Sequence, residues 1–392
     1  MTNARPTDRN PWAPDTVADR TMPSSQVRQN VIAKARKIVV KVGTHTICSP
    51  DGGLDRLAVL ELAGQVFSAM RRGVSVTLVA SGAIGAGRSE LGLRARPTTL
   101  PKLQAAAAVG QGQLMREFHD VFQHMGVRVA QVLLTRDDFE HRTRYLNIRN
   151  TLRALEEFGA LPIINENDTV AVDEIRYGDN DMIAALVANM LQVDLLVFLT
   201  TVDGLMKAGQ VLDVVHEVDD EVLALAGEGR SRLGSGGMAS KLAAAGVVMR
   251  AGEAAVIASS RQKGVLDRLL AGEKLGTVFV PARRKMSSRR RWIGLASRPA
   301  GKVLVDDGAA AALREKGKSL LPSGVRAVLG EFEKGATVSV IDSSGRQVAR
   351  GLTNYSSQQL DRIKGLKTSQ IAAALGDKPY DEVVHRNNMT LG

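Results

Sequence analysis

Apolar, β-branched runs bounded by glycine or polar residues recur along the first half of the chain. They are KIVVKVG (37–43), VSVTLVASG (74–82), VRVAQVLLT (127–135), ALPIINEND (160–168) and VDLLVFLTT (193–201). Stretches with the period of an amphipathic helix lie between them, such as residues 56–72 and 145–158. Nearly continuous apolar strands that alternate with helices are typical of a parallel sheet covered on both faces. The pattern therefore predicts an α/β fold, a three-layer αβα sandwich with a mainly parallel central sheet.

Changes in composition predict the domain boundaries. Residues 35–282 hold the α/β pattern, and the segment 283–298 carries seven bases and no acid, which is typical of a basic linker. Short strands with closely spaced turn residues predict a small, mainly β domain at 299–380, followed by a tail at 381–392. Residues 1–34 mix Arg, Asp and Pro without an apolar core. They predict a disordered extension rather than a secretory signal.

Charge and cysteine content narrow the classes of partner. The formal net charge of +11 is compatible with a polyanion such as RNA, but a basic run without an aromatic stacking platform is more often a solvated linker. No apolar run approaches the roughly 20 residues that span a bilayer, so no membrane partner is expected. Cys48 stands alone, which rules out an intramolecular disulfide and favours the reducing cytoplasm.

The segment NENDTVAVDEIRYGDND (165–181) crowds six carboxylates and three asparagines around a single base. Like charges at this spacing repel one another, so the crowding indicates a binding site for something cationic. Asn180 or Asp181 could also be the N-cap of the apolar helix that follows. That alternative does not explain NEND at the end of a strand.

Residues suited to phosphate follow other strands. Lys41 lies just before Gly43 and Thr44 at the end of the first strand, and Ser81 and Gly82 follow the second. Helix N-termini attract anions, and glycine permits close approach. The segment GSGGMASK (234–241) can expose successive N–H groups and ends in a lysine, although a flexible turn explains its composition equally well. A phosphoryl donor together with an amino-acid acceptor would use both kinds of site.

With these motifs the chain closely resembles the glutamate 5-kinases of the amino acid kinase family. The matching motifs are VVKVGT (39–44), SGAIGAG (81–87), AAVGQGQLM (107–115), INENDTVAVDEIRYGDND (164–181) and GSGGMASK (234–241). The segment 305–325 resembles the PUA domain that many of these kinases carry. The resemblance implies the amino acid kinase fold and the transfer of the γ-phosphoryl of ATP to the side-chain carboxylate of L-glutamate. This reaction is the first step of proline biosynthesis, and proline commonly inhibits it.

The resemblance also implies roles for individual residues. Lys41 and Lys241 would grip the phosphoryl group, and Asp181 would hold the two lysines in working order. Glutamate would be bound by Ser81, Gly82, Asp168 and Asn180. The nucleotide would be bound by Lys41, Gly43, Thr44, Thr200, Thr201, Ser235, Gly236, Gly237, Met238, Ala239, Ser240 and Lys241. Residues 204–213 would border the adenine.

The implied cofactor is Mg²⁺, which accompanies ATP, and the implied assembly is a homodimer or homotetramer. Another carboxylate kinase of the same fold, acting on acetylglutamate or aspartate, is a first alternative. An RNA-binding protein is a second one, because the pI is 9.9 and the tail resembles a PUA domain. RNA binding by that domain could also be an accessory function.

Overall fold

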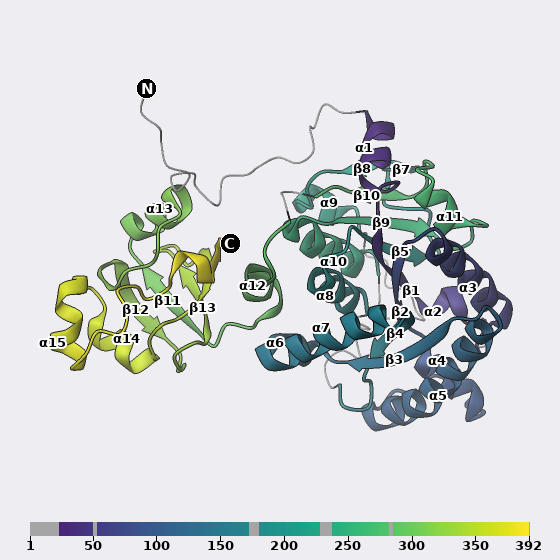
Figure 1. Ribbon diagram of the computed structural model, residues 1–392, viewed down its shortest axis with the longest axis horizontal. Coiled ribbons are helices and arrows are strands. Elements are labelled where there is room, and N and C mark those ends of the chain that lie inside the picture. Colours follow the sequence, from purple (N-terminus) through teal and green to yellow (C-terminus); the bar gives the residue numbers. More distant parts are fainter. Residues whose placement is uncertain (1–22, 50–52, 172–179, 228–236, 282–284, 392) are drawn as a thin grey trace. The chain divides into compact units, whose positions relative to one another are not determined.

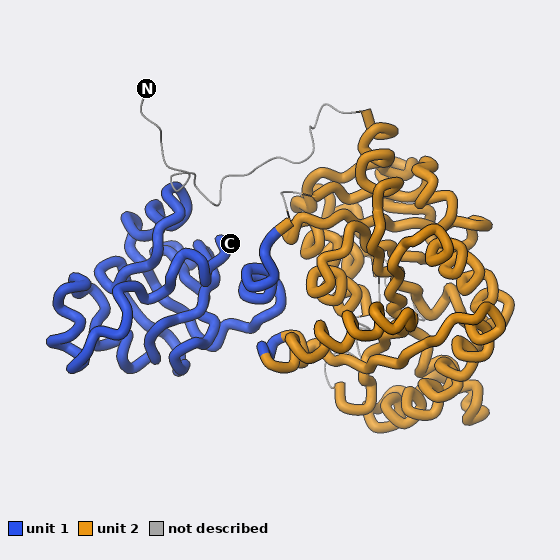
Figure 2. The backbone as a smooth tube through the Cα atoms, in the orientation of Figure 1, with its two compact units in different colours: residues 1–15, 140–142, 286–392 blue, residues 16–139, 143–285 orange. Residues whose placement is uncertain are grey.

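The computed structural model describes residues 23–49, 53–171, 180–227, 237–281 and 285–391. The chain divides into two compact units (Figure 2). The larger unit covers residues 16–139 and 143–285, and the smaller one covers residues 1–15, 140–142 and 286–392. Within the described ranges, no helix is both long enough and apolar enough to span a bilayer.

An eight-stranded sheet forms the middle of the larger unit, in the order β3-β4-β2-β1-β5-β9-β10-β8 (Figure 1). The five strands expected from sequence are confirmed as β1 (Lys37–Val42), β2 (Ser75–Ala80), β3 (Arg128–Leu134), β4 (Ala160–Glu166) and β5 (Leu195–Thr200). The sheet is completed by β8 (Val214–Val215), β9 (Ala254–Ser259) and β10 (Thr277–Phe279). Only the β9–β10 pair of this sheet is antiparallel. The prediction of a mainly parallel sheet is therefore confirmed.

Helices cover both faces of this sheet and complete the three-layer sandwich (Figure 1). The core on one face includes side chains of α1 (Ser24–Val31), α3 (Arg56–Arg71), α5 (Leu100–His124) and α11 (Val265–Leu270). The opposite face packs against α8 (Asn180–Leu191) and α10 (Met238–Ala251). Further helices that precede the small domain are α2 (Thr44–Ile47), α4 (Ala83–Glu90), α6 (Arg136–Glu140), α7 (Arg142–Glu157) and α9 (Asp220–Ala224).

Side-chain alternation along β1 explains how a lysine enters the interior of the protein. Successive side chains of a strand point to opposite faces. Val40 and Val42 join the core beneath α3 and α5, whereas Lys41 lies on the face covered by α8. A single polar residue in an apolar strand is thereby directed toward the helices that carry its partners.

The N-terminal helix α1 corrects one sequence prediction. Its residue Val27 and the following Ile32 are buried in the same core as β1. The predicted disordered extension 1–34 is therefore wrong for this part, and residues 1–22 lie outside the described ranges. The helix lacks a strong start signal, because Pro23 stands at its N-cap and makes no side-chain capping bond.

The smaller unit holds a five-stranded sheet in the order β12-β11-β13-β14-β15. Its strands are β11 (Gly301–Val305), β12 (Val325–Leu329), β13 (Thr337–Ile341), β14 (Gln347–Leu352) and β15 (Met389–Leu391). Its helices are α13 (Asp307–Lys316), α14 (Ser357–Ile363) and α15 (Ile371–Leu375), with 3₁₀ turns at Pro322–Gly324, Thr368–Gln370 and Arg386–Asn388. Buried residues such as Val303, Val338 and Leu360 give it a core of its own. The prediction of a small, mainly β domain is confirmed.

Two predicted segments at the borders of this domain are more ordered than expected. The basic segment 283–298 contains the helix α12 (Ser288–Arg291) and a π-helix over Trp292–Ala296. Within it Arg291 is buried, and its Nε donates to the Met286 carbonyl at 2.7 Å. The tail 381–392 contributes β15, which pairs antiparallel with β14. The tail is thus part of the small domain's sheet.

Candidate active site

The carboxyl ends of β2, β1 and β5 lie side by side at one edge of the large sheet. Val42, the last residue of β1, pairs with Ala80 of β2 and with Leu199 of β5. Lys41 and Ser81 therefore gather at the same edge, beside the end of β5. In a parallel α/β sheet this is the edge where ligands bind.

Two lysines share a buried carboxylate at this edge. Lys41 Nζ lies 2.7 Å from Asp181 Oδ1, and Lys241 Nζ lies 3.1 Å from Asp181 Oδ2. The Ser240 hydroxyl donates to the same Oδ2 at 2.6 Å. Lys41 comes from β1, Asp181 from the first turn of α8, and Ser240 and Lys241 from the first turn of α10. The structure brings together all three residues predicted to be catalytic, and the oxygens of Asp181 contact lysine and serine side chains.

Burial and charge set the protonation states of this cluster. Burial alone would raise the pKa of Asp181, but the charges of Lys41 and Lys241 and the hydrogen bonds lower it to about 2. Burial lowers the pKa of Lys241, and the charge of Lys41 lowers it further, while Asp181 acts in the opposite direction. Two ammonium groups beside one carboxylate leave net positive charge, which suits an anionic ligand.

Three side-chain amides form a chain at the ends of β2 and β4, and a backbone N–H fixes their orientation. The Glu166 N–H donates to Asn165 Oδ1 at 2.9 Å, so Asn165 Nδ2 is the group that donates to Gln111 Oε1, at 2.8 Å. Asn180 Nδ2 donates to Asn165 Oδ1 at 3.1 Å and to Ser81 Oγ at 3.0 Å. Among the described residues, the buried Gln111 Nε2 and Asn180 Oδ1 have no hydrogen-bond partner. The chain therefore offers one donor and one acceptor to a ligand.

Close packing of α4 against α5 brings Gln111 to this position. A Cβ on Gly87 would lie 1.7 Å from the Ala106 carbonyl oxygen, and a Cβ on Gly110 would lie 1.8 Å from the Ala83 carbonyl oxygen. Glycine is required at both positions because any side chain would force the helices apart. The two backbones touch at the residue that precedes Gln111.

Ser81 and Gly82 make the turn between β2 and α4. Gly82 has a φ of +114°, a backbone conformation that side chains disfavour, and a Cβ there would lie 3.2 Å from Cys48 Sγ. This turn directs the Ser81 hydroxyl to Asn180. Ser81, one of the four residues predicted to bind glutamate, therefore contacts the amide chain, and Gly82 follows it directly.

Asp168 lies in the turn that follows β4. Burial raises the pKa of its carboxyl to about 6, and the positive charge of Arg96 opposes this rise. The carboxylate is therefore ionised at neutral pH and becomes protonated in mildly acidic solution. A carboxylate in this state suits a cationic group.

The residues predicted to bind the nucleotide belong to the same edge. Gly43 and Thr44 follow β1, and a Cβ on Gly43 would lie 3.9 Å from Lys41 Nζ. Thr200 ends β5, its carbonyl accepts a hydrogen bond from the Ser260 N–H at 2.7 Å, and Thr201 comes next along the chain.

The glycine-rich segment is described in part. Gly237, Met238, Ala239 and Ser240 form the N-cap and first turn of α10, next to Lys241. Ser235 and Gly236 lie outside the described residues. The Ser240 side chain contacts Asp181, so it belongs to the lysine–aspartate cluster as well as to the predicted nucleotide segment.

The contacts of Gln111, Asn165 and Arg96 at the candidate site were not predicted from the sequence. Asn165 lies inside the crowded acidic segment, but an amide whose orientation is fixed by the next backbone N–H has no sequence signature. Gln111 follows Gly110 in an alanine-rich helix. Gly110 was the available sequence signal for this site, because a glycine inside a helix often marks a close approach of two backbones.

Two family models and several known glutamate 5-kinases match the sequence of this chain. The amino acid kinase family model matches residues 36–259, and the PUA domain model matches residues 301–375. A glutamate 5-kinase of Moorella thermoacetica is 47% identical over 365 residues, which cover 91% of this chain and 97% of that protein. A glutamate 5-kinase of Caldanaerobacter subterraneus subsp. tengcongensis is 46% identical over 362 residues, with the same coverage. Among solved structures, carbamate kinase from Giardia lamblia bound to AMP-PNP covers 63% of this chain and 99% of its own, with a TM-score of 0.46 and 18% identity.

Proposed function

Because this chain belongs to the glutamate 5-kinases of the amino acid kinase family, we propose that its lysine–aspartate cluster transfers the γ-phosphoryl of ATP to the side-chain carboxylate of L-glutamate. The product is L-glutamyl 5-phosphate, and the reaction is the first step of proline biosynthesis. The observation that carries the assignment of the site is the pair of buried lysines, Lys41 and Lys241, held on either oxygen of Asp181.

The chemistry needs positioning and charge more than covalent help from the protein. A glutamate carboxylate oxygen attacks the γ-phosphorus, and the bond from that phosphorus to the β–γ bridging oxygen breaks, so that ADP leaves. Lys41 and Lys241 neutralise charge on the oxygens of the transferring group. Asp181 keeps the two like-charged side chains at fixed positions. A carboxylate acceptor is already ionised near pH 7, so the step requires no general base.

Recognition of glutamate is supported by the unpaired atoms of the amide chain. Asn180 Oδ1 can accept a hydrogen bond from the α-ammonium group, and the ionised Asp168 adds negative charge for it. Gln111 Nε2 can donate to a carboxylate of the substrate. Ser81 and Gly82, in the turn after β2, complete the proposed glutamate-binding site beside Asn180. A free amino group and a carboxylate are both required by such a receptor.

The nucleotide is proposed to bind at Gly43, Thr44, Thr200, Thr201 and the segment 235–241. Mg²⁺ enters with ATP as part of the substrate and contributes charge neutralisation on the phosphates. Among the described residues, no group of three or more His, Cys, Asp and Glu side chains is arranged so that it could hold a metal ion. The proposal also includes inhibition by proline and assembly into a homodimer or homotetramer, which rest on the family resemblance. It includes a cytoplasmic location, which rests on the single Cys48.

Two alternatives are weakened by the same observations. Acetylglutamate lacks a free ammonium group, so the negative charge of Asp168 would have no substrate cation to pair with. Aspartate is shorter by one methylene and would hold its side-chain carboxylate farther from the lysines. A protein that only binds RNA would have no use for a buried cluster of Lys41, Asp181 and Lys241.

Release of ADP with glutamate, acetylglutamate and aspartate as acceptors tests the proposal. We expect turnover with glutamate, and we expect Lys241→Ala to lower kcat by about 10²–10³ while the KM for glutamate stays within about threefold. Turnover with acetylglutamate but none with glutamate would overturn the substrate assignment. A wild-type kcat in Lys241→Ala would overturn the role of the cluster.

A further inference from the structure

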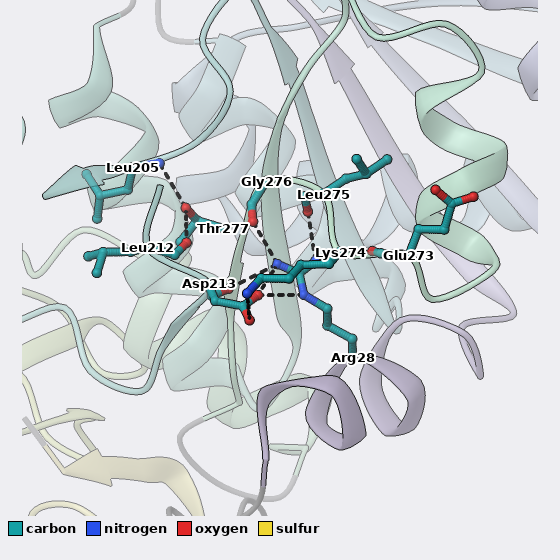
Figure 3. A network of polar contacts seen from close by, with 9 residues as sticks. All are labelled: Arg28, Leu205, Leu212, Asp213, Glu273, Lys274, Leu275, Gly276 and Thr277. Carbon is teal, nitrogen blue, oxygen red and sulfur yellow. Dashed lines mark hydrogen bonds and ion pairs between the residues drawn. The ribbon is translucent and has the colours of Figure 1, made fainter. Parts of the chain in front are cut away.

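Arg28 of the N-terminal helix is buried and fully engaged with a distant part of the chain (Figure 3). Its Nε donates to Asp213 Oδ1 at 2.7 Å, its Nη1 donates to the Leu275 carbonyl at 2.7 Å, and its Nη2 donates to the Gly276 carbonyl at 2.7 Å. Nη2 also donates to the Asp213 carbonyl at 3.2 Å. A planar guanidinium can serve this many acceptors at once, whereas an ammonium group cannot.

Asp213 is the charged partner that α1 holds. Burial would raise the pKa of Asp213, but hydrogen bonds from Ser24 and Arg28, the charge of Arg28 and a hydrogen bond from Lys274 hold it below its usual value. Ser24 and Arg28 lie one turn apart on α1 and therefore share a face of the helix. Removing Arg28 would leave the carboxylate with the Ser24 hydroxyl and with the Lys274 ammonium, which lies 3.2 Å away and is itself largely exposed.

From Asp213 the network continues to Leu205 and Leu212 (Figure 3), which flank a hairpin of β6 (Met206–Lys207) and β7 (Gln210–Val211). The buried Thr277 hydroxyl donates to the Leu212 carbonyl at 2.6 Å and accepts from the Leu205 N–H at 2.8 Å. The Leu212 N–H donates to the Leu205 carbonyl at 2.8 Å. Arg28 binds Asp213 and Gly276, which adjoin Leu212 and Thr277 in the sequence. It therefore fixes the base of the hairpin.

A short connection joins this base to β5. Gly204 precedes Leu205, and a Cβ on it would lie 2.6 Å from Val211 Cγ1 and 2.7 Å from Thr277 Oγ1. Residues 201–204 are therefore held between the end of β5 at Thr200 and a tightly packed hairpin base. Any displacement of that base would move the backbone that follows Thr200.

We propose that Arg28 is a positioning residue for ATP: by binding Asp213 and the carbonyls of Leu275 and Gly276, it makes helix α1 the support of hairpin 205–213 and of the segment after Thr200. The inference rests on the proposed nucleotide role of Thr200, Thr201 and the adjoining hairpin. It gives the N-terminal helix, which lies before the kinase motifs in the sequence, a part in nucleotide affinity. Arg28 acts through the backbone and does not itself touch the nucleotide.

Steady-state kinetics of Arg28→Lys, Arg28→Met and Asp213→Asn in the full-length protein test this inference, with Arg72→Met as the matched control. Arg72 also pairs with an aspartate, Asp267, at 2.5 Å, but it has no bond to the hairpin. We expect Arg28→Met to raise the KM for ATP about tenfold and the Kd for AMP-PNP by a similar factor, while the KM for glutamate stays within about twofold. Arg28→Lys and Asp213→Asn should show the same selective change to a smaller degree, and Arg72→Met should show none.

A second control separates positioning from stability alone. Val121→Ala removes packing from the same core on α5, far along the chain from the hairpin, and lowers the melting temperature. An ATP KM that stays at the wild-type value in every Arg28 and Asp213 variant would overturn the proposal. Equal increases in the two KM values, or an ATP effect equally large in Val121→Ala, would also overturn it. If Arg28→Met does not fold, Arg28→Lys and Asp213→Asn decide the matter. Failure of the proposed catalytic site would instead be seen in the kcat of Lys241→Ala.

Discussion

Replacing Asp181 by asparagine removes the carboxylate shared by Lys41 and Lys241 without changing the size of the side chain. The two ammonium groups, 2.7 and 3.1 Å from its oxygens, would then repel each other in a site where the aspartate side chain is fully buried. One lysine would shift or lose its proton, because burial already lowers the pKa of Lys241. Since both charges are needed on the transferring phosphoryl group, we expect kcat to fall by about 10²–10³.

The same substitution has a cost in stability that follows from the pKa of Asp181. The change from 3.8 to about 2 corresponds to about 2 kcal/mol of unfolding free energy, at about 1.4 kcal/mol for each pH unit. Because the pKa is lowered in the folded protein, this stabilisation is complete above about pH 4 and is lost as the pH falls toward 2. Asp181→Asn should therefore unfold more easily than the wild type by about 2 kcal/mol at pH 7, and the difference should narrow below about pH 4.

The matched control is Glu156→Gln, another carboxylate-to-amide change beside a lysine of β1. Glu156 lies 2.5 Å from Lys37 at the opposite end of the strand, and both side chains are partly exposed. We expect this variant to keep its kcat and to lose less than about 1 kcal/mol. ADP release and urea unfolding give the two measurements. A wild-type kcat in Asp181→Asn, or an equal loss of kcat in Glu156→Gln, would show that the shared carboxylate does not position the two lysines for catalysis.

The glutamate receptor yields the remaining predictions. Asp168→Ala should raise the KM for glutamate about tenfold or more while that for ATP stays within about twofold, and an unchanged glutamate KM would contradict the receptor. Because the pKa of Asp168 is raised to about 6, the carboxylate becomes protonated on acidification; the wild-type glutamate KM should rise as the pH falls below 6, and Asp168→Asn should lack this dependence. Gln111→Leu should raise the glutamate KM, and this rise should exceed any rise in the ATP KM of Gln111→Glu. Initial-rate measurements at fixed ATP and at fixed glutamate give the two KM values. No change of KM in either variant would show that the amide chain does not orient the substrate.

The central strands of the fold were predictable because their physical signal is local. An apolar run such as KIVVKVG reads as a buried strand with little reference to the rest of the chain. The strand β9 (Ala254–Ser259) was missed, since a short alanine-rich run is equally compatible with a helix. The helix α1 was missed because its start lacks a capping side chain and its surroundings are rich in Arg, Asp and Pro.

The candidate site shows the same division between local and distant signals. Lys41 and Asp181 stood out as charges at the ends of apolar elements, and the family motifs supplied their partner Lys241. The free donor on Gln111 is identified only through the contact of its amide oxygen with Asn165, which spans 54 residues. The bond between Arg28 and Asp213 spans 185 residues. Pairings at this separation are set by the packing of the whole domain, so one sequence does not reveal them.

A crystal structure of the protein with MgADP, aluminium fluoride and L-glutamate would show whether the two lysines bind the phosphoryl group during its transfer. We expect Lys41 Nζ and Lys241 Nζ both to lie within hydrogen-bonding distance of the fluoride or oxygen atoms of the transferring group, with the glutamate ammonium against Asn180 Oδ1. Lysines that turn away from the terminal phosphate position would contradict it.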